Sequence, residues 1–248
     1  MGFKRIIFLG DSHLRGDGTE WPGLWKKIIK FDQGFNQQAW SHKVRTCNGD
    51  YKSLRLEFDR YYGPKMQKHS AWILETRDKE SFAARIAKYF NVPFTNYSNS
   101  FTSISEMLPF LNYTAIDLEY KDSFFLVSLP PAIGDVNYRM EGEKLKNVTI
   151  PNYAAQLMLI KEFIENRGGM MCYFHSEDYP EELYDMTLNP YLMDLGPLRV
   201  FEGHLGMLLG SSYQHKRMDG KHYDLSGQKM IAHLLIQKLD SPDFFRIL

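Results

Sequence analysis

Two short segments near opposite ends of the chain carry side chains that could act together in hydrolysis. The first, Gly10–His13, reads Gly-Asp-Ser-His and follows a short apolar run. The second, Asp219–His222, reads Asp-Gly-Lys-His and precedes a segment with helical periodicity. A serine, a histidine and an aspartate supply the nucleophile, the general base and the orienting carboxylate of acyl transfer. The two segments therefore predict a catalytic unit of Ser12, His222 and Asp219.

The spacing inside the second segment supports this interpretation. An aspartate three residues before a histidine allows a turn to bring the Asp219 carboxylate onto the His222 ring and fix its tautomer. Asp224 is a good helix N-cap, and Gly227 allows close packing of the helix that follows. We expect the buried face of that helix to consist of four apolar residues, Met230, Ile231, Leu234 and Leu235.

Positioning these segments requires a scaffold, and the remaining pattern alternates strands with helices. The expected strands are Lys4–Leu9, Val92–Tyr97, Ser123–Leu129, Met170–Phe174 and Leu198–Phe201. The expected helices are Lys79–Phe90, Ser103–Leu111, Asn152–Asn166 and Asp224–Leu239. This alternation predicts an α/β fold with a five-stranded parallel sheet covered on both faces, a three-layer α/β/α sandwich. In such sheets the chemistry lies at the carboxyl ends of the strands, where Ser12 falls.

Local signals set the expected boundaries of two helices. Asp78 is a good N-cap for the helix Lys79–Phe90. Its apolar face is expected to hold Phe82, Ile86, Ala87, Tyr89 and Phe90. Pro109 is expected to bend or end the helix Ser103–Leu111.

We expect one domain over residues 1–248, with a tryptophan-rich insertion at about 18–77. All four tryptophans lie in this stretch, at Trp21, Trp25, Trp40 and Trp72. Helical spacing predicts a helix over Trp21–Lys30 within it. Because long loops in compact domains often form lids or binding surfaces, at least one of these tryptophans is expected to line a cleft near Ser12.

Composition narrows the possible partners and the compartment. Lys plus Arg and Asp plus Glu are equal at 30 each, so charge gives no reason to expect nucleic acid or an anionic membrane as a partner. Cys47 and Cys172 are too few for a disulfide framework, which favours a reducing compartment. No apolar run approaches the length of a membrane span or a signal peptide core. These features predict a soluble, cytoplasmic protein and leave the oligomeric state open.

The two end segments together resemble the SGNH (GDSL-like) hydrolases, whose first block is Gly-Asp-Ser and whose last is Asp-x-x-His ahead of a helix containing glycine. The resemblance implies a flavodoxin-like strand order and ester hydrolysis through an acyl-serine intermediate, without metal or cofactor. Ser12 would attack the carbonyl, His222 would take and return the proton, and Asp219 would orient the ring. The expected substrate is a short acyl ester, such as an acetyl ester, of a sugar or similar small polar molecule.

Between the two ends the sequence departs from the family's pattern. The glycine of the second block would fall at about Phe101, and the Gly-x-Asn of the third block would fall at Pro130–Ala132. The expected oxyanion-hole donors are therefore the Ser12 amide, an amide near Phe101, and a substitute side chain from Asn99 or Asn137.

Two other functions compete with the esterase. The missing oxyanion residues favour an SGNH scaffold that has little catalytic power and serves as a binding or structural module. Asp11 and His13 also form an Asp-x-His pair, which opens the metal site of calcineurin-like metallophosphoesterases. Gly134-Asp135 and Gly203-His204 faintly echo later blocks of that family, but its Gly-Asn-His-Asp/Glu block does not occur in the sequence. We therefore expect no metal ligands.

Overall fold

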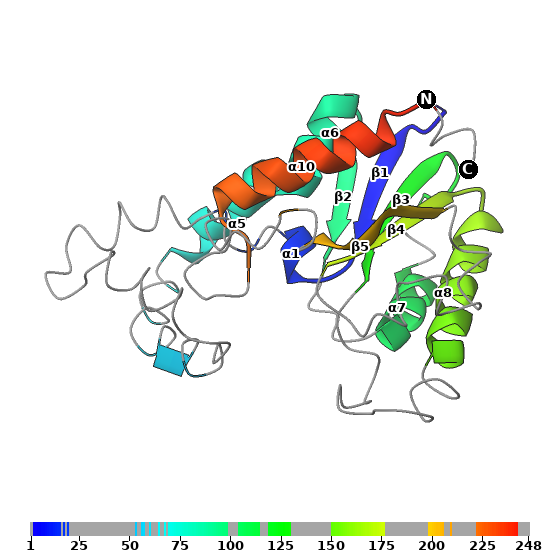
Figure 1. Ribbon diagram of the computed structural model, residues 1–248, viewed down its shortest axis with the longest axis horizontal. Coiled ribbons are helices and arrows are strands. Elements are labelled where there is room, and N and C mark those ends of the chain that lie inside the picture. The colour runs from blue at the N-terminus through cyan, green and yellow to red at the C-terminus, as the bar shows by residue number, and fades with distance from the viewer. Residues whose placement is uncertain are drawn as a thin grey trace, which may run out of the picture.

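The centre of the molecule is a five-stranded sheet in which all strands are parallel (Figure 1). The computed structural model describes residues 2–15, 69–98, 104–114, 119–129, 150–176, 198–205 and 222–242, and single positions 17, 19, 53, 56, 57, 60, 64, 67 and 209. The strands are β1 (Arg5–Leu9), β2 (Phe94–Tyr97), β3 (Ser123–Leu129), β4 (Met170–His175) and β5 (Arg199–His204). Their order is β2-β1-β3-β4-β5, which is the order of flavodoxin-like sheets. The predicted α/β fold with a five-stranded parallel sheet is confirmed.

The strands are continuous apolar runs because both faces of the sheet are covered. All seven residues of β3 are buried, and four of the five in β1 are. Parallel sheets need helical crossovers that pack on their faces, so an alternating polar pattern is not expected in the central strands. The register pairs Leu9 of β1 with Tyr97 of β2 and with Val127 of β3. The carboxyl ends of these three strands therefore lie together.

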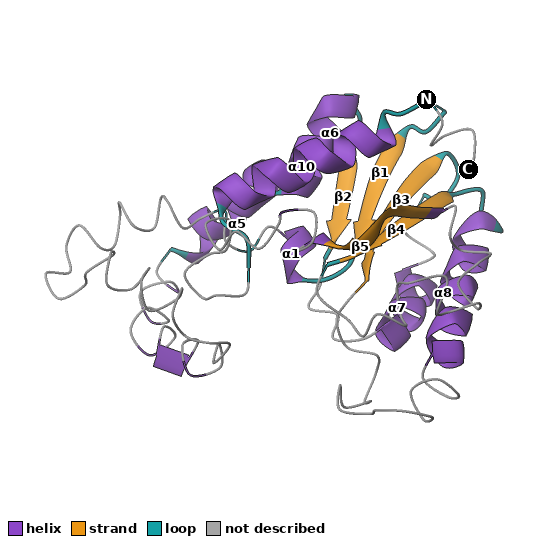
Figure 2. Cartoon of the chain, in the orientation of Figure 1, coloured by secondary structure: helices purple, strands orange, loops and turns teal. Residues whose placement is uncertain are grey.

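Helices lie against both faces of the sheet (Figure 2). On one face, α6 (Phe82–Phe90) and α10 (Leu225–Leu239) pack on alternate strand residues. This core contains Ile6, Phe8, Phe124, Leu126, Cys172, Phe174, Ile86, Ile231 and Leu235. On the other face, α7 (Met107–Thr114) and α8 (Ile150–Glu165) cover Ile7, Leu9, Phe125, Val127, Met171 and Tyr173.

The helix expected at Lys79–Phe90 is in fact two helices. α5 spans Ser70–Glu80, and Ser81 separates it from α6. The Ser81 side chain accepts a hydrogen bond from the Ala84 amide at 3.2 Å and is the N-cap of α6. The prediction of Asp78 as the N-cap was wrong, because this residue lies inside α5. Tyr89 was also misplaced on the buried face, since its side chain is largely exposed.

The other helices differ from expectation at their ends. A short 3₁₀ turn, η2 (Ile104–Glu106), leads into α7, which continues past Pro109 to Thr114. Pro109 does not end the helix, because it lies in the first turn, where amides have no intrahelical partner. Asp224 caps α10 as predicted and accepts from the Gly227 amide at 2.9 Å.

Some expectations about packing were wrong or lie outside the described residues. Met230 is 39% exposed and does not belong to the buried face of α10. Residues 70–77 of the expected insertion belong to α5, which carries the half-buried Trp72. The expected helix Trp21–Lys30 and the other three tryptophans, Trp21, Trp25 and Trp40, lie outside the described residues. Among the helices that the structure describes, none is long and apolar enough to cross a membrane.

Candidate functional site

The candidate site is at the carboxyl end of β1, which lies between β2 and β3 in the sheet. Ser12 is the first residue of α1 (Ser12–Arg15), which begins three residues after the last residue of β1, on the side to which the strand arrowheads point (Figure 1). Gly10 lies between them, and a Cβ built on it would be 2.6 Å from the Ser128 Cβ and 2.7 Å from the Ser128 carbonyl oxygen. Glycine is therefore needed for β1 and β3 to approach each other immediately before Ser12.

Asp11 joins the ends of three strands. Its side chain is buried, and one carboxylate oxygen accepts a hydrogen bond from the Ser176 hydroxyl, which follows β4. The other oxygen is 3.4 Å from the Ser128 hydroxyl near the end of β3. The Ser176 hydroxyl is also 3.1 Å from the Leu129 carbonyl oxygen. These contacts give Asp11 a structural role next to α1, because each of its carboxylate oxygens faces a serine hydroxyl.

The short helix α1 is held in place by a contact with the core and by a hydrogen bond from β2. Leu14 is fully buried in the core that α6 and α10 share. Its carbonyl oxygen accepts a hydrogen bond of 3.3 Å from the Asn96 side-chain amide of β2. The side-chain oxygen of Asn96, Oδ1, in turn accepts a hydrogen bond from the Ser98 backbone amide at 3.1 Å. Leu14 therefore joins α1 to β2 and to the core.

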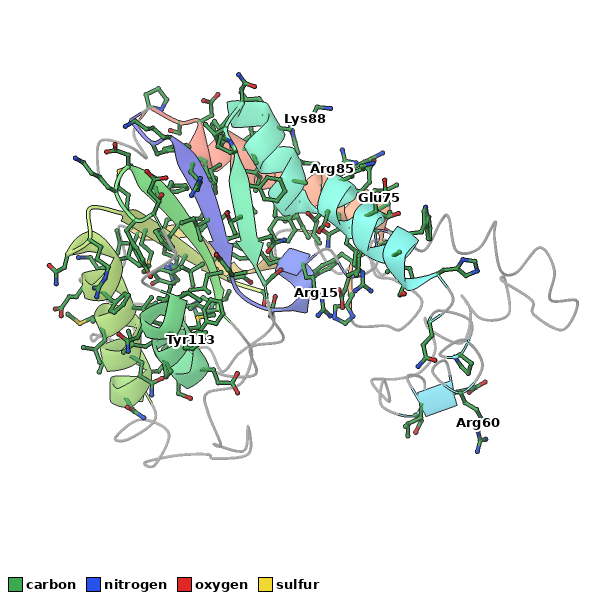
Figure 3. All side chains as sticks on the ribbon, turned by 180° about the vertical axis from the view of Figure 1, so that it is seen from behind. Arg15, Arg60, Glu75, Arg85, Lys88 and Tyr113 are labelled. Atoms are coloured by element: carbon green, nitrogen blue, oxygen red, sulfur yellow. The ribbon has the colours of Figure 1, made fainter. Side chains whose placement is uncertain are left out.

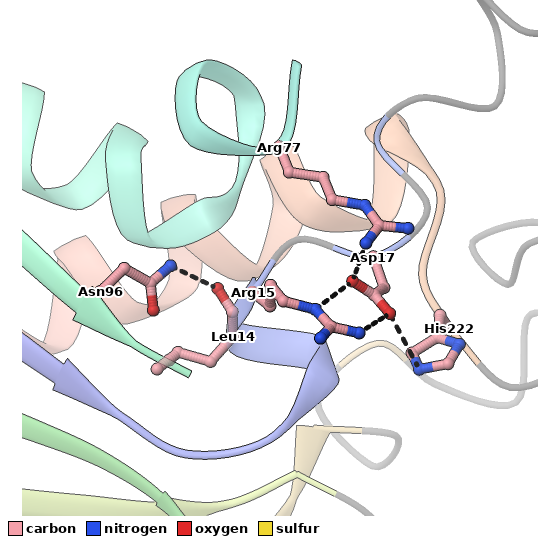
Figure 4. A network of polar contacts seen from close by, with 6 residues as sticks. All are labelled: Leu14, Arg15, Asp17, Arg77, Asn96 and His222. Atoms are coloured by element: carbon pink, nitrogen blue, oxygen red, sulfur yellow. Dashed lines mark hydrogen bonds and ion pairs between the residues drawn. The ribbon is translucent and has the colours of Figure 1, made fainter. Parts of the chain in front are cut away.

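His222 lies beside a buried network of charged side chains (Figure 4). The His222 side chain is 7% exposed, and its Nε2 is 3.9 Å from the Asp17 Oδ2. Asp17 accepts two hydrogen bonds from the Arg15 guanidinium, from Nε at 2.7 Å and from Nη2 at 2.6 Å. The Arg77 Nη1 is 2.8 Å from the Asp17 Oδ1. Asp17 thus connects the segment after α1, helix α5 and the segment before α10.

Burial makes the interactions of this network stronger than those of a surface ion pair. The Asp17 and Arg77 side chains are 9% and 13% exposed, whereas Arg15 is 35% exposed. A bidentate pair between a guanidinium and a carboxylate combines two charge-assisted hydrogen bonds, and low solvent exposure reduces screening. The distance of 3.9 Å between Asp17 and His222 is too long for a hydrogen bond, and the contact is an ion pair only when the His222 ring is protonated.

A second cluster of polar side chains lies near the carboxyl end of β4, on the face of the sheet that α7 and α8 cover. Tyr153 of α8 and Tyr173 of β4 both contact the ring of His175, and the Tyr153 hydroxyl is 3.5 Å from the His175 Nδ1. Burial raises the pKa of Tyr173 to about 12 and holds the pKa of Tyr153 well above its ordinary value. Because none of the three side chains is more than 1% exposed, this group is part of the core.

The structure brings two of the predicted residues to the same end of the sheet. Ser12 starts α1 there, and His222 is buried beside Asp17, five residues after Ser12. Asp219, Asn99, Phe101 and Asn137 lie outside the described residues, so the predicted Asp219–His222 contact and the oxyanion hole remain predictions.

Arg15, Asp17 and Arg77 were not predicted from the sequence as residues of the site. Arg15 and Asp17 stand directly after the Gly-Asp-Ser segment, and this proximity was a usable signal. Arg77 gave no signal, because its contact with Asp17 depends on the packing of α5. Within the described ranges, no three His, Cys, Asp or Glu side chains come together as a possible metal site.

Comparison with known proteins adds no relative: no family model, no curated protein and no solved structure matches this chain.

Proposed function

We propose that the protein is a serine hydrolase of the SGNH type that cleaves a short acyl ester of a sugar or another small polar molecule. The observation that carries this proposal is the contact between His222 Nε2 and Asp17 Oδ2. It joins the segment that starts with Ser12 to the segment that starts with Asp219, which are the two that resemble the family. A buried histidine close to the segment that follows β1 is in the region where parallel sheets carry their chemistry.

The architecture supports the same proposal. An order of β2-β1-β3-β4-β5, with helices packed against both faces, is compatible with the three-layer sandwich of SGNH hydrolases. The last helix, α10, starts three residues after His222 and is capped by Asp224. The segment that carries the histidine is therefore held by a fixed helix end.

In the proposed mechanism the Ser12 hydroxyl attacks the ester carbonyl while His222 takes its proton. His222 then gives the proton to the alcohol as the bond between the acyl carbon and the alcohol oxygen breaks, which leaves the acyl-serine. Water next attacks the acyl carbon while His222 takes its proton, and His222 returns that proton to the Ser12 oxygen as the free acid leaves. Asp219 orients the His222 ring and stabilises its charged form. The reaction needs no metal or cofactor.

The proposed oxyanion hole consists of the Ser12 amide, an amide near Phe101 and a side-chain amide from Asn99 or Asn137. Pro130 and Pro131 cannot donate from the backbone. One missing donor typically costs about 10²–10³ in rate. We therefore expect slow turnover of simple activated esters.

Labelling with a fluorophosphonate probe tests the proposal, because the probe reacts with an activated serine. We expect the wild-type protein to be labelled at Ser12 and the Ser12→Ala and His222→Ala variants to lose both labelling and ester turnover. The double variant should be no worse than either single one, because members of a catalytic unit are not additive. Ser70→Ala and His233→Ala are matched controls at exposed helix positions. Labelling of a different serine, or full turnover by Ser12→Ala, would refute the assignment.

A binding module is the second candidate, and the departures at Phe101 and Ala132 favour it. Such a module would bind polar esters without turnover, and Ser12 would not react with the probe. Calorimetric binding of an acetylated sugar, with no product formed over hours and no labelling, would establish this alternative. Circular dichroism of each variant confirms that the fold is intact.

A further inference from the structure

Asp17 lies in the site but has no role in the proposed reaction. Its side chain is 9% exposed, and it receives two hydrogen bonds from Arg15 and an ion-pair contact from Arg77. A carboxylate bound by guanidinium groups is stabilised in its charged form. The site therefore contains a fixed negative charge whose orientation is set by two separate elements, α1 and α5.

This charge faces one particular nitrogen of His222. The Asp17 Oδ2 is 3.9 Å from the His222 Nε2, and this same oxygen accepts the hydrogen bond from the Arg15 Nη2. In a Ser-His-Asp unit the orienting aspartate holds Nδ1, and Nε2 takes the proton of the serine. Asp17 therefore lies on the side of the ring at which the proton arrives, and its charge stabilises the imidazolium that forms.

We propose that Asp17 is a positioning residue that holds the Nε2 edge of His222 toward α1 and stabilises the protonated ring. The proposal rests on the proposed function in one respect, namely that His222 is the general base for Ser12. It goes beyond that function by giving His222 a second carboxylate partner, and by giving Arg15 and Arg77 the task of fixing that partner.

The two arginines also set the strength of the effect. Among the described residues, Asp17 is a charged group next to the ring, and Arg15 and Arg77 bind the same carboxylate (Figure 4). Each guanidinium offsets part of the negative charge that His222 experiences. Removing the carboxylate and removing one guanidinium must therefore shift the pKa of His222 in opposite directions, whereas general loosening of the site would shift it in one direction.

Titration of the His222 ring by nitrogen–proton NMR measures this coupling without any substrate. We expect Asp17→Asn to lower the pKa of His222 by about one pH unit and Arg77→Gln to raise it. The matched controls are Asp122→Asn, which breaks the exposed ion pair with Lys4 at the amino end of β3, and Arg85→Gln, which breaks the pair with Glu80. Neither control should move the titration.

Two results would overturn the proposal: an unchanged His222 titration in both variants, or a shift in the same direction in both. Asp17→Asn leaves two guanidinium groups facing an amide and can fail to fold. In that event Arg77→Gln decides alone, and an unchanged or lowered pKa of His222 would overturn the proposal.

The pH dependence of fluorophosphonate labelling then separates this proposal from the proposed function. In Asp17→Asn the acid limb of the labelling rate should move to lower pH with the pKa of His222, and the plateau rate should fall about tenfold or more. A purely structural part for Asp17 would lower the amount of labelled protein without moving the limb. If wild-type protein does not react with the probe, the proposed function fails, and the NMR titration still decides whether Asp17 acts on His222.

Discussion

Asp11 and Asp17 are both buried aspartates close to Ser12, yet their partners differ in kind. Asp11 is bonded to the neutral hydroxyls of Ser176 and Ser128, whereas Asp17 is bound by the guanidinium groups of Arg15 and Arg77. The contacts of Asp17 join two charged groups, whereas those of Asp11 join a carboxylate to neutral donors. Asp11 thus ties strand ends together, and Asp17 places a charge beside His222.

The structural part of Asp11 predicts unequal effects for its two serine partners. Ser176→Ala removes a donor from a buried carboxylate and should lower the free energy of unfolding by about 1–3 kcal/mol. Ser128→Ala should cost less, because its hydroxyl is 3.4 Å from the carboxylate and that contact is weak. Urea denaturation measures both, with Ser70→Ala as a control that should stay within about 0.5 kcal/mol of wild type. Equal costs for the two buried serines would contradict this assignment.

Residue types and spacing were sufficient to place Ser12 and His222 at one end of the sheet. A serine after the first strand and a histidine before the last helix both fall at the carboxyl edge of the sheet, because parallel strands end at a common edge. The same reasoning could not find the contact between Arg77 and Asp17. That contact depends on how α5 packs beside α1, and no local periodicity encodes the relative placement of two helices.

The helices α6 and α10 are joined by a hydrogen bond that local sequence could not reveal. The Gln228 side chain of α10 is fully buried, and its carbonyl oxygen accepts from the Phe82 amide at 2.9 Å. With the Ser81 cap, this bond satisfies two of the amides at the start of α6. Apolar periodicity predicted one helix over Lys79–Phe90 and located its C-terminal half well. It did not predict the break at Ser81, because the partner of the Phe82 amide lies on a helix far along the chain.

The junction between β1 and α1 predicts a strong effect of a single methyl group. In Gly10→Ala the new Cβ would meet the Cβ and the carbonyl oxygen of Ser128 at 2.6 and 2.7 Å. These atoms belong to a buried strand and cannot swing away, so overpacking should cost about 1–3 kcal/mol in unfolding free energy. The shift at the strand end should also slow the labelling of Ser12. Gly2→Ala is the matched control, because nothing lies within 4 Å of its Cβ. A Gly10→Ala protein as stable and reactive as this control would refute the tight approach.

The sheet as a whole was the most predictable part of the molecule. Ser123–Leu129 was predicted with the bounds that β3 has, because a short apolar run closed by two prolines has the length and the flanking residues of a buried strand. β5 extends to His204, beyond the expected end at Phe201. Its last residues include Glu202 and Gly203. These residue types are uncommon in strands, so the apolar run did not predict that the strand continues through them.

Burial of phenol groups across one face of the sheet predicts how the whole fold responds to alkali. The pKa values of Tyr120 and Tyr173 are raised from 10 to about 12, mainly by desolvation, and that of Tyr153 is raised well above 10. Above pH 10 the unfolded chain releases these protons while the folded protein keeps them. The stabilisation is therefore complete below pH 10 and is lost as the pH rises toward 12. Urea unfolding at a series of pH values should show this progressive loss.

Tyr173→Phe isolates one contribution to that loss. The Tyr173 hydroxyl is buried and has no hydrogen-bond partner among the described residues, so its removal relieves a desolvation cost. At pH 7 the variant should be as stable as wild type or about 1 kcal/mol more stable. Between pH 10 and 12 it should lose less stability, because each such tyrosine contributes about 1.4 kcal/mol per pH unit. Tyr113→Phe is the control, since this side chain of α7 is 83% exposed and points outward (Figure 3). A Tyr173→Phe protein that is clearly destabilised at pH 7, or whose alkaline loss equals that of wild type, would show that this hydroxyl has a partner outside the described residues.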